Sequence, residues 1–122
     1  MVICHELFPT SYLLALAPTA ATAAAAEMEL EAHLTYACRS GKPAVWVDCR
    51  LLDTLSATAA WLLWACQQRL HRRHARLVLC RVPEAVERIL QRTLASARAD
   101  LLSVPTLDRC GRAGVARAPR FS

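Results

Sequence analysis

The stretch AVWVDCRLLDTLSATAAWLLWAC, residues 44–66, decides the fold. A short apolar run ends in an acid at Asp48. A short connection that contains the polar residues Arg50, Asp53 and Thr54 follows. Ser56 then stands where a helix N-cap is expected, before a long segment with an apolar stripe. This order predicts a buried strand over 44–49, an exposed loop and a helix. In α/β domains, such a loop between the end of a strand and the start of a helix is where binding sites lie.

Two strands and a helix are predicted before this stretch. Val2–Phe8 and Tyr12–Ala17 are apolar runs around a Pro-Thr-Ser turn, and they predict an antiparallel hairpin. Ala20–Arg39 is predicted to be helical from propensity, with Thr19 or Thr22 as its cap. Helical spacing predicts that one stripe is buried: Ala23, Ala26, Leu30, Leu34, Ala37 and Cys38. The acids on the other side are expected to be solvated: Glu27, Glu29 and Glu31.

The chain after the loop repeats the alternation of helix and strand. Ser56–His74 is predicted to be a helix, Arg76–Val82 a buried strand, and Pro83 the first residue of a third helix. An edge strand is expected at 101–104. The order β-β-α-β-α-β-α-β predicts an α/β fold, with a mostly parallel sheet, an N-terminal antiparallel hairpin and helices packed on it.

Length and composition fit one domain. The chain has 122 residues, of which 55% are apolar, so a core is easily filled. We expect a single domain over 1–108 and a mobile tail over 109–122, where no apolar period occurs. The most apolar window is shorter than the ~20 residues that cross a bilayer. The first residues do not resemble a signal peptide, and a cytoplasmic location is the expectation.

The charges are unevenly distributed along the chain. Residues 1–66 carry three basic and six acidic side chains, whereas residues 67–122 carry twelve arginines and four acids. Such asymmetry can indicate an acidic partner or a nucleic acid. Because fourteen of the fifteen basic residues are arginines, which a GC-rich coding bias also produces, we do not expect nucleic-acid binding.

Several residue types that often carry chemistry are present without a site around them. None of the six cysteines has the two-residue spacing of a zinc or redox motif, so we expect reduced, buried thiols. His71 and His74 are three residues apart, but no acid or cysteine near them in sequence completes a metal site. The three glycines form no phosphate-binding loop. We therefore expect no catalytic residues, no metal and no cofactor, and we predict that the protein is not an enzyme.

The spacing of motifs over residues 44–94 is similar to that of a known family. Asp48 ends a strand, and Ser56-Ala57-Thr58-Ala59 begins eight residues later. Leu77–Cys80 and Val82–Val86 then follow without gaps. This arrangement resembles the STAS domain of anti-sigma factor antagonists and sulfate-transporter tails, in which a strand ending in Asp or Asn precedes Asp-Ser-Ser-Gly and an apolar helix. The resemblance implies a non-enzymatic module of STAS type.

The chain departs from that family at the residues that control it. In the antagonists, the first Ser of Asp-Ser-Ser-Gly is phosphorylated by a partner kinase, but here that position is Ala57. Ser56 stands at the Asp position, where it is interpreted as an N-cap, and Thr58 occupies the second Ser position. We therefore predict binding without the usual serine switch. Thr58 and Ser56 are the hydroxyls at which phosphorylation could still occur.

The predicted partner-binding surface covers residues 52–62 and consists of Asp53, Ser56, Ala57, Thr58 and Trp61. Trp61 has two interpretations: an exposed anchor for a partner or for a second copy of the chain, or a residue that completes the core. The resemblance implies an anti-sigma factor or a related kinase-fold protein as partner. The alternative is a cytoplasmic STAS subunit of a lipid-transport ABC system that binds its ATPase, because Asp53-Thr54 faintly resembles the Asp-Thr of that branch.

Overall fold

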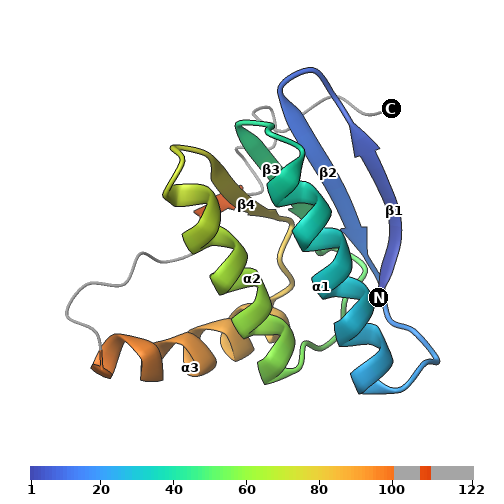
Figure 1. Cartoon of the computed structure of the whole chain (residues 1–122). Coiled ribbons are helices and arrows are strands. Elements are labelled where there is room, and N and C mark those ends of the chain that lie inside the picture. The colour runs from blue at the N-terminus through green and yellow to red at the C-terminus, as the bar shows by residue number, and fades with distance from the viewer. Residues whose placement is uncertain (101–107, 111–122) are drawn as a thin grey trace.

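The computed structural model describes residues 1–100 and 108–110, and its strands form one five-stranded sheet with the order β1-β2-β3-β4-β5. The hairpin strands β1 and β2 are antiparallel, and the pairs β2–β3, β3–β4 and β4–β5 are parallel (Figure 1). The strands are β1 (Val2–Leu7), β2 (Ser11–Leu16), β3 (Ala44–Asp48), β4 (Arg76–Cys80) and β5 (Asp108–Cys110). The predicted α/β class, with an antiparallel edge on a parallel sheet, is confirmed.

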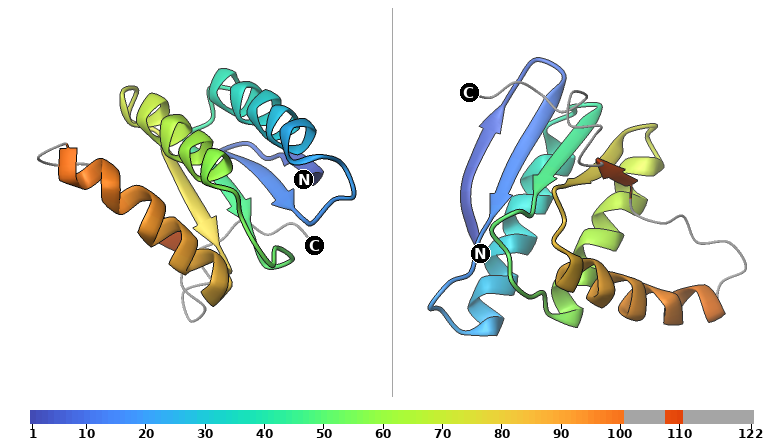
Figure 2. Two further views of the ribbon diagram at one scale, coloured as in Figure 1. Left: turned by 90° about the horizontal axis from the view of Figure 1, so that it is seen from below. Right: turned by 180° about the vertical axis from the view of Figure 1, so that it is seen from behind.

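Two helices, α1 (Ala23–Arg39) and α2 (Ala57–His71), lie over one face of this sheet, and α3 (Glu84–Asp100) packs against α2 (Figure 2). The side chains of a strand alternate between faces, so every second residue of β2, β3 and β4 points toward the helices. These residues join the helix residues in one large core, which includes Leu14, Val47, Leu79, Leu30, Leu63 and Leu90, all 0–1% exposed.

The opposite face of the sheet is apolar as well. Leu13, Trp46 and Val78 are paired across β2, β3 and β4 in one row, and each is at most 9% exposed. They form a second cluster with Cys80. Because both faces are buried, the central strands show little of the alternation that marks a half-exposed strand.

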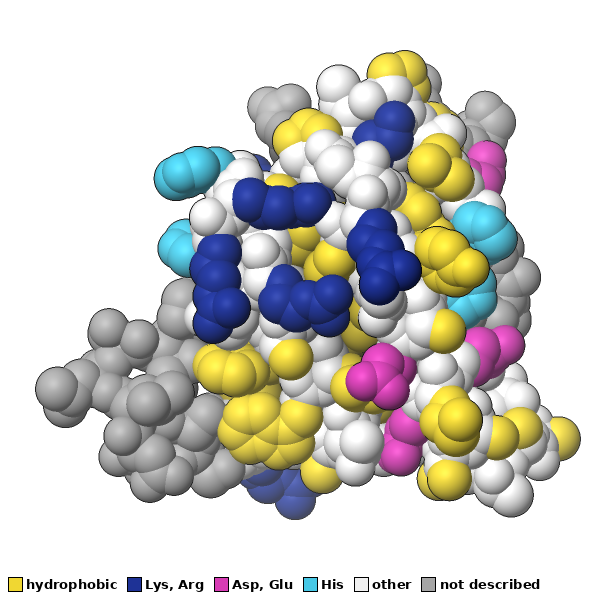
Figure 3. Space-filling model, viewed as in Figure 1, with side chains coloured by type: hydrophobic (Ala, Val, Ile, Leu, Met, Phe, Trp, Pro, Cys, Tyr) yellow, Lys and Arg dark blue, Asp and Glu magenta, His cyan; other side chains and the backbone are white. Residues whose placement is uncertain are grey.

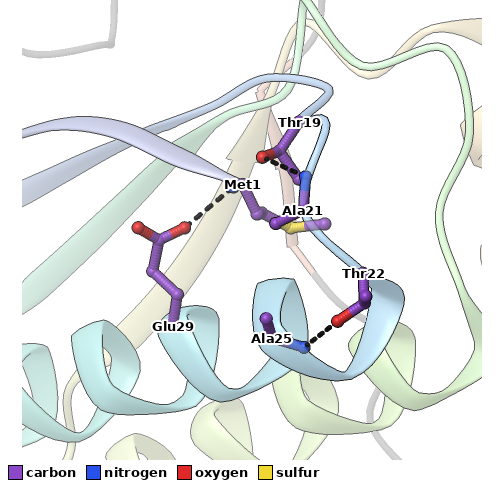
Figure 4. A network of polar contacts seen from close by, with 6 residues as sticks. All are labelled: Met1, Thr19, Ala21, Thr22, Ala25 and Glu29. Carbon is purple, nitrogen blue, oxygen red and sulfur yellow. Dashed lines mark hydrogen bonds and ion pairs between the residues drawn. The ribbon is translucent and has the colours of Figure 1, made fainter.

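The start of α1 lies three residues later than predicted. The Thr22 hydroxyl accepts a hydrogen bond from the Ala25 N–H at 3.2 Å, which identifies Thr22 as the N-cap, while Thr19 accepts one from the Ala21 N–H (Figure 4). The predicted stripe is confirmed except for Ala23, which is exposed because the first helical residue extends beyond the sheet. Glu29, expected to be solvated, is 2.8 Å from the amino group of Met1.

Residues in the left-handed backbone region set three boundaries. Gly41 follows the last turn of α1 with a φ of 75°. His74 has a φ of 61° and ends α2 at His71, three residues before the predicted end. Arg81, with a φ of 54°, ends β4 at Cys80 rather than at Val82. The sequence contains glycine only at the first of these positions, so the other two could not be predicted from composition.

The C-terminal predictions fall largely on residues 101–107 and 111–122, outside the described part of the chain. The strand expected at 101–104 lies there, and so does most of the expected tail. Arg109 and Cys110, which we expected in that tail, belong to β5 and pair with Leu79 and Cys80. Among the described residues, no helix has the length and apolar character needed to cross a membrane.

Candidate functional site

The loop after β3 lies at the carboxyl end of the sheet and is held in place by backbone and apolar contacts. The Cys49 N–H donates to the Cys80 carbonyl at 2.9 Å, and the Leu52 N–H donates to the Cys49 carbonyl at 3.0 Å. Leu52 and Leu55 are each 4% exposed and anchor the loop in the core. The other side chains of the loop, before and between these anchors, face solvent: Arg50, Leu51, Asp53 and Thr54.

Asp48, the acid at the end of the strand, is used inside the loop. Its side chain is buried, and Oδ1 accepts a hydrogen bond from the Arg50 N–H at 3.1 Å. Oδ2 is 3.6 Å from Arg50 Nε in an ion pair whose arginine is exposed. An aspartate that accepts a backbone N–H two residues on stabilises a turn. Asp48 therefore fixes the direction in which the chain leaves β3.

Ser56 begins α2 and connects it to α1. Its hydroxyl oxygen accepts a hydrogen bond from the Ala59 N–H at 3.0 Å, which is the predicted N-cap contact. The same hydroxyl donates to Glu27 Oε2 at 2.6 Å, a short distance that is typical of a charge-assisted O–H···O⁻ bond. Both the donor and the acceptor capacity of Ser56 are therefore used within the protein.

The prediction that Glu27 is solvated is wrong. Glu27 is half-buried because α1 and α2 both start at the carboxyl end of the sheet and lie side by side there (Figure 1). Helical periodicity placed Glu27 away from the sheet, but it did not show that a neighbouring helix would cover that side. Each of the two helices follows a strand of the parallel part of the sheet, so both start at the same edge. This common starting point is the signal that could have indicated a contact between α1 and α2.

The residues after Ser56 present a small, accessible surface. Ala57 and Thr58 are exposed, and Trp61, one turn further along α2, is 37% exposed. The Trp61 ring packs edge-on against Trp64, with ring centroids 5.7 Å apart, so one indole supports the other. Of the two interpretations of Trp61, the exposed residue describes its position better than the residue that completes the core.

Apolar side chains are visible at the surface where the N-terminal half of α2 and α3 lie close together (Figure 3). Trp61 and the partly buried Trp64 belong to this half of α2. An aromatic side chain that is held by another ring and partly exposed is a typical anchor of protein interfaces. Asp53, in the adjoining loop, adds a negative charge to the same end of the helix.

The candidate metal ligands and acids of the described residues do not come together at this surface. No group of three or more His, Cys, Asp and Glu side chains within the described ranges could hold a metal ion. His71 and His74 are both exposed at the far end of α2. Asp53 is exposed, whereas Asp48 is buried against Arg50, so the two acids differ in environment and Asp48 is already occupied. What the surface exposes is an indole, small side chains, a threonine hydroxyl and the Asp53 carboxylate.

Comparisons with known proteins identify the fold. No protein-family model matches the chain, and no curated protein sequence matches it either. Two solved structures are similar to it with a TM-score of 0.66 each. One is a serine-to-glutamate variant of RsbS from Moorella thermoacetica, 11% identical, where the match covers 87% of this chain and 83% of that one. The other is the anti-sigma factor antagonist SpoIIAA in its unphosphorylated form, 12% identical, with 93% and 91% covered. The chain therefore has the fold of the STAS domain, as the resemblance predicts.

Proposed function

We propose that this protein is a non-enzymatic regulatory module that binds a partner protein through the loop and helix start at 52–62. The fold likeness to an anti-sigma factor antagonist supports an anti-sigma factor, or a related kinase-fold protein, as the partner. The observation that carries the proposal is the exposed Trp61 beside a loop that two buried leucines anchor in the core. A loop anchored in this way has less conformational freedom to lose on binding, which favours affinity.

The engaged hydroxyl of Ser56 supports the absence of the usual serine switch. A kinase would have to break the hydrogen bonds that Ser56 makes with Glu27 and with the Ala59 N–H before it could transfer a phosphoryl group. The phosphate would then lie beside the Glu27 carboxylate, and the two negative charges would repel each other. Ala57, at the position of the phosphorylated serine in the family, has no hydroxyl. These contacts support binding without covalent control of Ser56.

Thr58 is the hydroxyl at this surface that a kinase could reach. It is exposed in the first turn of α2, where a phosphate would be close to unpaired backbone N–H groups. We propose that Thr58 is unmodified and contributes only a neutral surface. Mass spectrometry of the protein from its own host tests this point, because stoichiometric phospho-Thr58 would show that a switch exists at a shifted position.

The binding surface is tested by affinity capture with the full chain as bait, followed by titration calorimetry with the purified partner. We expect capture of a protein with an anti-sigma kinase fold, and at least tenfold weaker binding by Trp61→Ala, since anchors of this kind contribute about 2 kcal/mol or more. Tyr36→Ala is the matched control, because Tyr36 is a 66% exposed aromatic residue on α1 outside the proposed surface.

Two results would contradict the proposal. If folded Trp61→Ala binds the partner as tightly as the unaltered protein, the surface at 52–62 is not the interface. If the captured protein is a transporter ATPase instead, the proposed partner class is wrong and the protein is a STAS subunit of a transport system. The exposed Asp53-Thr54 pair would then belong to the surface that binds the ATPase.

A further inference from the structure

Two cysteine thiols meet at the opposite end of the contact between α1 and α2. Cys38 Sγ and Cys66 Sγ are 3.3 Å apart, although the two residues are 28 positions apart in the sequence. Both are reduced and buried. A disulfide bond is about 2.05 Å long, so the two sulfur atoms would have to approach each other by only about 1.3 Å to form one.

The surroundings of the pair favour a thiolate on Cys38. Its side chain is 7% exposed, against 1% for Cys66, so it is the one of the two that a small oxidant can reach more easily. The hydrogen bond from the Cys66 thiol has the largest effect on Cys38, and burial opposes it. Together with the smaller effects of the positive charges of Arg69 and Arg73, the result is a pKa of Cys38 lowered to about 6. That same hydrogen bond, together with burial, raises the pKa of Cys66.

The positive charges belong to a larger group of basic side chains. Figure 3 shows Lys and Arg side chains gathered over the C-terminal halves of α1 and α2. A cysteine that is slightly accessible and lies in an electropositive environment has the features of a reactive thiol, whereas a structural cysteine is buried in apolar surroundings. Cys49 belongs to the same apolar core as Cys38 and Cys66, but its thiol is directed toward the Val47 carbonyl and it is 1% exposed.

We propose that Cys38 and Cys66 are a peroxide-sensitive thiol pair that closes to a disulfide between α1 and α2. The Cys38 thiolate attacks one oxygen of hydrogen peroxide, the O–O bond breaks, and a sulfenic acid and hydroxide form. The Cys66 sulfur then attacks the Cys38 sulfur, the S–O bond breaks, and the hydroxyl group leaves as water with the proton of the Cys66 thiol. In total, two thiols lose two electrons and two protons, and one peroxide molecule becomes two water molecules.

The disulfide would join two helices whose N-terminal ends are already connected by the Ser56–Glu27 hydrogen bond. Cys38 lies in the last turn of α1 and Cys66 in the second half of α2, so the covalent bond would hold the other end of the same interface. A bridge that closes a loop of this length restricts the unfolded chain, and we expect the melting temperature to rise by roughly 10 °C.

The experiment treats the full, reduced chain with hydrogen peroxide and maps its thiols by peptide mass spectrometry without reduction. We expect one intramolecular Cys38–Cys66 bridge, a higher melting temperature, and reversal of both by dithiothreitol. Cys38→Ser and Cys66→Ser should each abolish the bridge. Cys80→Ser should retain it, and it is the matched control because Cys80 is buried to nearly the same extent, with 6% exposed.

A second measurement tests the role of the arginines without changing either thiol. Below the pKa of Cys38, the amount of thiolate falls with every rise in that pKa. Arg69→Gln combined with Arg73→Gln should therefore slow the peroxide reaction at pH 5.5 by about threefold. Arg72→Gln, an exposed neighbour on the same helix end, should leave the rate unchanged. Oxidation of Cys38 to a sulfinic acid without a bridge, a bridge between other cysteines, or a Cys38 that reacts no faster than Cys80 would each overturn the proposal.

Discussion

Replacement of Ser56 by alanine removes two hydrogen bonds at once, and their contributions can be separated. The N-cap bond to the Ala59 N–H has a typical value of about 1 kcal/mol. The bond to Glu27 is charge-assisted at 2.6 Å, but Glu27 is only half-buried, so we assign it about 1 kcal/mol, below the usual range of hydrogen bonds to charged groups. Ser56→Ala should therefore lower the free energy of unfolding by about 2 kcal/mol.

Thr22→Ala supplies a matched control within the same protein. Thr22 caps α1 through its hydrogen bond from the Ala25 N–H at 3.2 Å, and it lies at the same edge of the sheet as Ser56. Its loss should lower stability by about 1 kcal/mol, the contribution of a cap alone. The difference between the two variants then measures the bond to Glu27.

A double-mutant cycle isolates that bond more directly. Urea unfolding of Ser56→Ala, Glu27→Ala and the double variant should give a coupling energy of about 1 kcal/mol. If the coupling is zero within error, or if Ser56→Ala is no more destabilised than Thr22→Ala, the Ser56 hydroxyl is not held by Glu27. The argument that this serine is unavailable to a kinase would then fail as well.

Three further perturbations test other parts of the structure. His74→Gly should raise the free energy of unfolding in urea by about 1 kcal/mol, because glycine adopts the φ of 61° without strain. Gly41→Ala should lower the free energy of unfolding by about the same amount, because alanine is strained at the φ of 75° found there. A loss of stability in His74→Gly would contradict this assignment. Asp48→Ala should lower the free energy of unfolding by about 1.5 kcal/mol. Asp48→Asn should change it by less than about 0.5 kcal/mol, because its side chain can still accept the hydrogen bond from the Arg50 N–H. Equal losses of stability in the two variants would mean that the charge of Asp48 matters. The pKa of Cys38 is lowered from 9.0 to about 6, so its thiolate forms as the pH rises through 6, and its alkylation by iodoacetamide should level off by pH 8 while an ordinary thiol still accelerates. An alkylation rate at Cys38 that rises steadily to pH 9 would be inconsistent with the contact between the two thiols.

Local sequence patterns were sufficient to predict the strands and helices of this fold. The apolar runs of β3 and β4, the N-cap at Ser56 and the proline before α3 each identify their element from a few neighbouring residues. The alternation of strands and helices then predicts a parallel sheet, because each helix returns the chain to the end of the sheet where the previous strand began. The errors lie at the ends, where His74 and Arg81 adopt a backbone conformation that their side chains do not predict.

The sequence predicts where the candidate site lies in the fold, but not which of its residues contact each other. Its position follows from the strand, loop and helix order, and the exposure of Ala57 and Thr58 agrees with it. The sequence could not decide whether Trp61 is covered, because this depends on how α3 packs beside α2. It also could not show that Ser56 has a second partner, since Glu27 is 29 residues away.

One property of the α1–α2 interface connects the two unpredicted contacts. Glu27 meets Ser56 at a separation of 29 residues, and Cys38 meets Cys66 at a separation of 28. A nearly constant offset means that the two helices run parallel and in step, and Glu27 and Cys38, eleven residues apart, lie about three helical turns apart on one side of α1. The spacing of eleven residues thus corrects the expectation that put Glu27 with the solvated acids on the side opposite Cys38. The offset itself is set by the loops that join α1, β3 and α2. The same packing that occupies the Ser56 hydroxyl at one end of the interface therefore brings two thiols together at the other.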